Sequence, residues 1–91
     1  MVLVYGVIYL NMPQIKTIKG KRAVVNSLKD KLKNRNISLL DISSSYNKEA
    51  EIAFCFLASN QKAKQQFLFK LERLLERDFG EFEFDIEYED I

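Results

Sequence analysis

The segment 81–89 alternates without a break between apolar and acidic side chains. Its apolar members are Phe82, Phe84, Ile86 and Tyr88, and its acidic members are Glu81, Glu83, Asp85, Glu87 and Glu89. Because successive side chains of a β-strand point to opposite faces of a sheet, this period of two predicts a strand with one buried and one solvated face.

Three further segments are typical of strands. Residues 2–11 are rich in Val, Ile, Leu and Tyr, which predicts a central strand buried on both faces that ends before Pro13. Residues 37–43 and 50–58 flank a short, turn-rich link at 43–47, and this spacing predicts an antiparallel hairpin.

Two segments have helical periodicity. Residues 18–34 follow Thr17, which we expect to cap the first helix, and residues 61–78 follow Ser59 and Asn60. We expect Gly80 to end the second helix in the left-handed conformation. The expected buried stripes are Ile18, Val25, Leu28 and Leu32 beside Val24 in the first helix, and Ala63, Phe67, Leu71 and Leu74, flanked by Leu68 and Leu75, in the second.

The resulting order of elements is βαββαβ. With right-handed crossovers it predicts an α+β, ferredoxin-like domain over residues 1–91, with two helices on one face of a four-stranded antiparallel sheet. The first and third strands are expected at its centre. The length of 91 residues suits one domain.

Charge is divided unevenly along the chain, although the net charge is only +1. Residues 16–35 contain eight basic residues and one acid, whereas residues 76–91 contain eight acids and one basic residue. On a helix, Arg22, Asn26, Lys29 and Lys33 fall on one stripe. Such a row either tracks a phosphate backbone or is a solvated face whose long side chains cover apolar surface. The residues expected to contact nucleic acid are Lys19, Lys21, Arg22, Lys29, Lys33 and Arg35.

Catalytic patterns are scarce. The sequence contains no histidine, which excludes histidine-based triads and metal sites, and Gly20-Lys21 lacks the rest of a phosphate-binding loop. Asp41 and Glu51 are the best candidates for a general base, but solvated strand positions suit both better. The acidic residues of the last strand are better explained as an edge that prevents aggregation than as a divalent-cation site. We expect a non-enzymatic protein without metal, cofactor or small-molecule partner.

Aromatic residues indicate a second kind of surface. Tyr5 and Tyr9 share one face of the first strand, where an open sheet would resemble the base-stacking face of RNA-recognition motifs. The RNP1 pattern is absent from the third strand, however, and the acidic fourth strand repels RNA, so a homodimer interface explains these residues better. Phe69 lies opposite the apolar stripe of its helix and is a further interface candidate.

The N-terminal residues 1–10 are apolar, but they lack a basic region and a cleavage pattern, and they are too short to span a bilayer. We therefore expect a cytoplasmic protein without a membrane partner. Cys55 is the only cysteine, which excludes an intrachain disulfide, and we expect it to be an inert strand residue.

The first helix carries a family resemblance. The segment Thr17–Val25, followed by Leu28–Arg35, is similar to the Ser-Leu-Lys-Glu-Lys-Arg helix of the bacterial YlxP-like proteins, and the similarity continues through 37–41, 50–53 and 57–60. The resemblance implies a ferredoxin-like fold and no assigned activity. Genes of this family often lie near those of translation factors and a ribosome-binding factor, which implies a role around ribosomes or RNA.

Two positions depart from the family pattern. Gly20 replaces a Glu that would complete a capping box with the N-cap residue. An Asp-x-Trp element between strands two and three is replaced by residues 44–48, where Tyr46 is the only aromatic residue.

Two functional hypotheses follow, with a carboxylate-based enzyme as a weaker third. The first is an RNA- or ribosome-associated protein that uses the basic first helix. The alternative is a dimeric structural or regulatory module that binds a protein partner.

Overall fold

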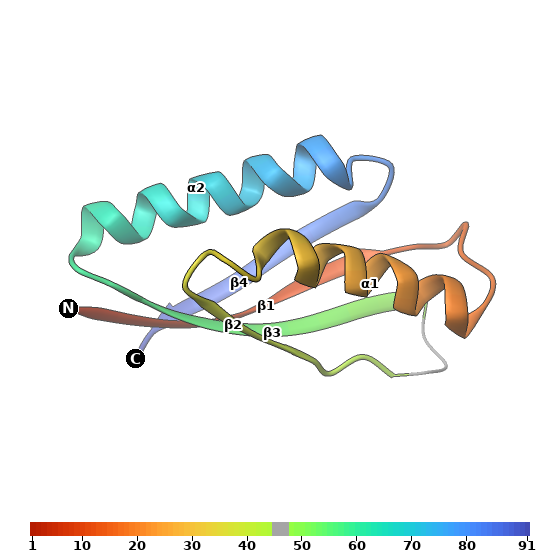
Figure 1. Ribbon diagram of the computed structural model, residues 1–91, viewed down its shortest axis with the longest axis horizontal. Coiled ribbons are helices and arrows are strands. Elements are labelled where there is room, and N and C mark those ends of the chain that lie inside the picture. The colour runs from red at the N-terminus through yellow and green to blue at the C-terminus, as the bar shows by residue number, and fades with distance from the viewer. Residues whose placement is uncertain (45–47) are drawn as a thin grey trace.

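The computed structural model describes residues 1–44 and 48–91 and has the predicted order of elements (Figure 1). The elements are β1 (Val2–Asn11), α1 (Ile18–Leu32), β2 (Ile37–Asp41), β3 (Glu49–Ala58), α2 (Gln61–Asp78) and β4 (Glu83–Asp90). The sheet order is β2-β3-β1-β4, and all neighbouring strands are antiparallel. Both helices lie on the same face of the sheet. The predicted ferredoxin-like α+β fold, with β1 and β3 at the centre, is confirmed.

The core lies between this face of the sheet and the two helices. It contains Val4, Ile8 and Leu10 of β1, Ile52, Phe54 and Phe56 of β3, Val25, Leu28 and Leu32 of α1, and Leu68, Leu71, Leu74 and Leu75 of α2. On the other face of β1, Leu3 and Tyr5 are 37% and 41% exposed. The prediction that β1 is buried on both faces is therefore wrong, because the helices cover only one side of the central strands.

Both predicted helix caps are present. The Thr17 hydroxyl accepts a hydrogen bond from the Gly20 amide at 2.9 Å, and the Asn60 side-chain carbonyl accepts one from the Ala63 amide at 2.9 Å. These bonds satisfy amides that have no partner within the helix.

The buried stripes differ from the predicted ones at their ends. Ile18 is exposed, while Ile15 in the preceding loop packs against the core. Ala63 and Phe67 are only half-buried, because the covered side of α2 is centred on Leu68 and Leu75. Phe67 lies at the margin of the core, with its ring 4.1 Å from that of Phe56.

The end of α2 also differs from the prediction. No glycine in the described residues has a positive φ angle, so Gly80 is not a left-handed cap. Phe79 caps the helix instead, and its amide donates to the Leu75 carbonyl at 2.9 Å. Gly80 is needed for space, because a Cβ there would lie 2.5 Å from the Glu76 carbonyl oxygen. Asn36, after α1, adopts the left-handed conformation with φ of 54°.

The bounds of four elements differ from the predicted ones by one or two residues. Helix α1 ends at Leu32 instead of residue 34, β2 ends at Asp41 instead of residue 43, β3 begins at Glu49 instead of residue 50, and β4 spans 83–90 instead of 81–89. Phe82 is in a turn, where its amide donates to the Phe79 carbonyl at 3.0 Å. Within the described residues, no helix is long and apolar enough to cross a membrane.

Candidate nucleic-acid interface

Helix α1 packs on β2 and β3, near one edge of the sheet, and the acidic strand β4 forms the other edge. Its buried apolar residues Val25, Leu28 and Leu32 point to the core, and most of its polar residues face solvent. Lys19 and Arg22 of α1 are exposed, and so are Lys33, which caps the helix, and Arg35 in the turn that follows. We call these four residues the cationic row. From Lys19 to Lys33 the row covers about 21 Å of helix.

Lys21 is different from the other predicted nucleic-acid contacts, because it is only 8% exposed. Its ammonium group donates a hydrogen bond of 2.6 Å to the Ser44 carbonyl and fastens α1 to the chain after β2. Lys21 lies four residues before Val25 and seven before Leu28, on the buried stripe. Its apolar stem therefore packs inside while its charged end reaches the rim.

Lys29 is half-buried and faces the end of β2. Partial burial raises the pKa of Asp41, but hydrogen bonds from Ser43 and the charges of Lys21 and Lys29 outweigh this effect, so the pKa lies below its ordinary value. A general base at neutral pH would need the opposite shift. Asp41 thus offsets charge on α1.

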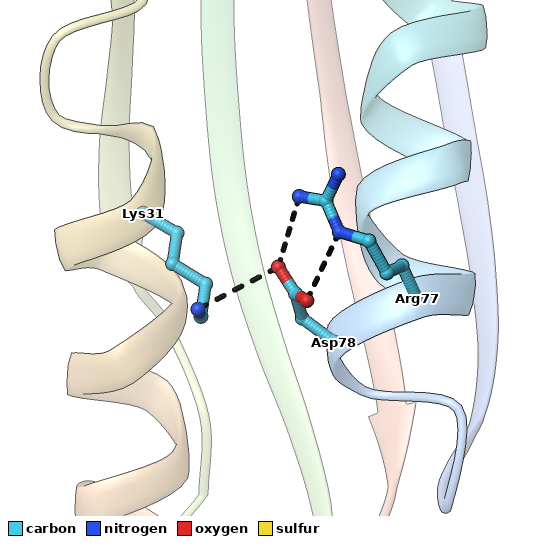
Figure 2. A network of polar contacts seen from close by, with 3 residues as sticks. All are labelled: Lys31, Arg77 and Asp78. Atoms are coloured by element: carbon cyan, nitrogen blue, oxygen red, sulfur yellow. Dashed lines mark hydrogen bonds and ion pairs between the residues drawn. The ribbon is translucent and has the colours of Figure 1, made fainter.

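Lys31 joins the two helices through a network at the end of α2 (Figure 2). Its ammonium nitrogen lies 3.5 Å from a carboxylate oxygen of Asp78, and the Arg77 guanidinium contacts both oxygens of the same carboxylate at 3.1 Å. The Arg77 hydrogen bonds lower the pKa of Asp78, partial burial raises it, and the charges of Arg77 and Lys31 lower it further, to below its ordinary value. The two cations offset the unfavourable position of an acid at a helix C-terminus.

A second ion pair joins α2 to β4. Lys64 is 7% exposed, and its ammonium group lies 3.0 and 3.2 Å from the two carboxylate oxygens of Asp90. Hydrogen bonds from Gln61 and Lys64 lower the pKa of Asp90, and they outweigh the opposite effect of partial burial.

Because the pKa values of Asp78 and Asp90 are lowered in the fold, we expect the protein to lose stability in acid. A carboxyl group whose pKa is lower in the folded than in the unfolded state stabilises the fold fully above the unfolded value, and the contribution disappears as the pH falls through the folded value. Because both pKa values lie below the usual 3.8, the loss begins near that pH and continues below it. The thermal midpoint, measured from about pH 7 to about pH 2.5, should fall less steeply in Asp78→Asn and Asp90→Asn than in the wild type.

Asp85→Asn is the matched control, because Asp85 is exposed on β4 and forms no ion pair with any described residue. If Asp78→Asn and Asp90→Asn lose stability in acid as steeply as the wild type and this control, the two ion pairs do not cause the acid sensitivity.

The predicted interface residues lie on two separate surfaces. Tyr5 and the half-buried Tyr9 are on the open face of the sheet, as their shared spacing predicted. Phe69 lies on α2, on the helix side of the sheet, where its 60% exposed ring contacts the Arg73 guanidinium at 5.8 Å. The structure therefore does not bring Phe69 together with the tyrosines. Homodimerisation through either surface stays a prediction.

Three further features concern the candidate general base, possible metal ligands and the aromatic residue of the altered link. Glu51 is half-buried in β3, beside Tyr9 of β1. Within residues 1–44 and 48–91, no group of three or more His, Cys, Asp or Glu residues is arranged to hold a metal ion. Tyr46, the aromatic residue in the altered link, lies outside the described residues.

The fold and its surfaces define a small ferredoxin-like protein with cations along one helix and acids along the opposite edge strand. A family model described as "Protein of unknown function (DUF503)" matches residues 3–88, so the chain belongs to this family. No curated protein matches the sequence. Among solved structures, the chain is similar to the de novo designed protein Foldit4, with 11% identity and a TM-score of 0.56 over 97% of this chain and 94% of that chain. This likeness concerns the fold alone.

Proposed function

We propose that this protein is a non-enzymatic, YlxP-like protein that associates with RNA, alone or in ribosomal subunits, and that the cationic row of α1 contacts phosphates. The exposure of Lys19, Arg22, Lys33 and Arg35 is the observation that carries the proposal. None of these four cations forms an ion pair with another described residue. Their charge is therefore available to an external anion, whereas Lys21 and Lys31 are engaged by the fold.

The start of α1 supports the same proposal. Lys19 and Arg22 lie close to the positive end of the helix dipole, and no acidic residue in the first turn of α1 offsets their charge. An isolated helix would be destabilised by this arrangement, and a bound phosphate relieves it. The positive end of the α1 dipole thus adds to the attraction that the Lys and Arg side chains exert on a phosphate, but it does not replace that attraction.

The open face of the sheet is a poor RNA surface. In RNA-recognition motifs the bases stack on aromatic residues of the sheet. Here the strand next to Tyr5 carries Glu87 and Glu89, and no strand contains a Lys or Arg. Negative charge beside the tyrosines repels a phosphate backbone. The helix side is therefore the better candidate.

Charge reversal of the row tests the proposal. In Lys19→Glu/Arg22→Glu/Lys33→Glu, binding to ribosomal subunits and to structured RNA should be lost or strongly weakened between about 50 and about 200 mM salt. For the wild type, binding should weaken steeply with salt, and loss of three phosphate contacts should lower the salt slope by about 2 to 3. Filter binding and sedimentation with subunits measure both quantities.

The matched control is Lys48→Glu/Lys62→Glu/Arg73→Glu. These three cations are also exposed, and they lie outside α1, so the net charge changes equally. If both triple variants lose binding to the same extent, net charge and not the row decides binding. If neither loses it, the proposed interface is wrong.

A further inference from the structure

The face of the sheet that the helices leave uncovered is apolar over three of its four strands. Leu40 of β2 is 65% exposed and Leu57 of β3 is 52% exposed. We call this surface the apolar floor, and its members are Leu3, Tyr5 and Val7 of β1, Ala53, Cys55 and Leu57 of β3, and Leu40 of β2, which pairs with Ala53. A contiguous apolar surface of this kind marks an interaction site more often than isolated exposed residues do.

Carboxylates border this floor on one long side. On β4, Glu89 pairs with Tyr5, Glu87 pairs with Val7, and Asp85 pairs with Tyr9. We call Asp85, Glu87 and Glu89 the acidic rim. Because none of the four strands contains a Lys or Arg, no basic residue of the sheet offsets this charge.

The pKa of Tyr9 reflects its desolvation and the negative charge at one end of the acidic rim. Desolvation, followed by the charges of Glu87, Glu51 and Glu49, raises the pKa of the Tyr9 hydroxyl. Carboxylates of β3 and β4 therefore act together on one point of β1, and the rim continues around the end of the floor.

A hollow lies where the floor meets the rim. It is shallow and open, has a volume of about 290 Å³, and is lined by Tyr5, Gly6, Val7, Glu87, Tyr88 and Glu89. An aromatic ring and an aliphatic side chain lie next to two carboxylates. This combination suits a Lys or Arg side chain, whose stem packs on apolar atoms while its charged end reaches carboxylates or an aromatic face.

We propose that the open face binds a basic amphipathic helix of a protein partner. The apolar stripe of this helix lies on the floor, and its Lys or Arg residues lie along the acidic rim, with one of them in the hollow. Complementary charge fixes the orientation of such a helix and speeds its association, while the apolar contact supplies most of the affinity. This site is independent of the proposed RNA contact, because the cationic row lies on the helix side of the sheet.

A second copy of the chain fits this surface less well. Two open faces packed together would bring no cation to either rim. Helix α1 of another copy would bring cations, but its apolar stripe of Val25, Leu28 and Leu32 is buried in its own core. It would therefore leave the floor uncovered.

The probe is a synthetic helix of about 18 residues, roughly five turns, with leucines on one stripe and lysines along one flank. A control peptide of the same sequence carries Glu in place of every Lys. Fluorescence anisotropy with the full chain should show binding of the lysine peptide only. Amide shifts in NMR spectra should be confined to the four strands of the sheet, Leu40 of β2 included. No binding of the lysine peptide, equal binding of the glutamate peptide, or shifts centred on α1, overturns the proposal.

Substitutions locate the site. Asp85→Asn/Glu87→Gln/Glu89→Gln removes three exposed charges and should weaken peptide binding about tenfold, because three exposed ion pairs of about 0.5 kcal/mol each correspond to about that change in affinity. The control Asp30→Asn/Glu72→Gln/Glu76→Gln changes the net charge equally at exposed helix positions and should bind like the wild type. Leu40→Ser/Leu57→Ser should also weaken binding while it leaves the thermal midpoint nearly unchanged. Equal losses in the two charge variants overturn the proposal, and so does a salt-insensitive dimer that Leu40→Ser/Leu57→Ser dissociates, because the occupant is then a second copy.

Discussion

Replacement of Gly6 by valine should lower the free energy of unfolding by about 3 kcal/mol or more, which is a large part of the stability of a domain of this size. Gly6 lies in the middle of β1, opposite Phe54 of β3 and Tyr88 of β4. A Cβ at this position would lie 2.5 Å from Cζ of Phe54, and it would also overlap the Glu87 carbonyl oxygen. The ring of Phe54 thus fills the space that a side chain would need.

Gly6→Ala gives the graded form of this test. Alanine in a strand is normally better than glycine by about 0.5 to 1 kcal/mol, so an open position would become more stable. Here we expect a loss of about 1 to 3 kcal/mol in urea unfolding followed by circular dichroism. Gly6→Ala should cost less in a Phe54→Leu background than in the wild type, because leucine lacks the ring atoms that the Cβ would meet. Some loss should remain, because the Glu87 carbonyl oxygen is still close. A stabilised Gly6→Ala protein would contradict the close packing.

The need for glycine at position 6 was not predictable from the sequence, although the strand that contains it was. Apolar composition identifies residues 2–11 as a central strand, and alternation identifies the solvated face of β4. Which ring of which neighbouring strand covers a glycine depends on strand register, and register is set by the tertiary structure.

The charged residues show the same limit. The pattern identified the basic helix, but it treated Lys21 as an accessible cation. Its spacing from Val25 and Leu28 was the available signal that it lies on the buried stripe. Lys64 lies four residues before Leu68 and is buried for the same reason, whereas its partner Asp90 is 26 residues away in sequence. A helix periodicity predicts which lysines turn inward, but it cannot predict which carboxylate or carbonyl they reach.

The wrong prediction for β1 bears on function. Its unbroken apolar sequence indicates burial on both faces, yet the chain itself covers only one. Local rules that fail in this way are expected at functional surfaces. The apolar side chains of Leu3, Tyr5 and Val7 are therefore consistent with a face that becomes covered by a partner. Together with the cationic row, this would give the protein two surfaces of opposite character on opposite sides of one sheet.

Two leucine-to-alanine substitutions distinguish the covered face from the open one. Leu75 of α2 is fully buried in the core, and Leu75→Ala should lower the free energy of unfolding by about 2 to 5 kcal/mol, because it removes buried methyl groups and leaves a cavity. Leu40→Ala makes the same chemical change on the open face. It should change the free energy of unfolding by less than about 0.5 kcal/mol.

Urea unfolding at two protein concentrations measures both effects. If Leu40→Ala costs as much as Leu75→Ala and its cost grows with protein concentration, a second copy already covers the open face in solution. If Leu40→Ala is neutral at both concentrations, Leu40 contributes nothing to the fold of the isolated chain. An exposed leucine that the fold does not need, on the same open face of the sheet as the acidic rim, then has its explanation in what the protein binds.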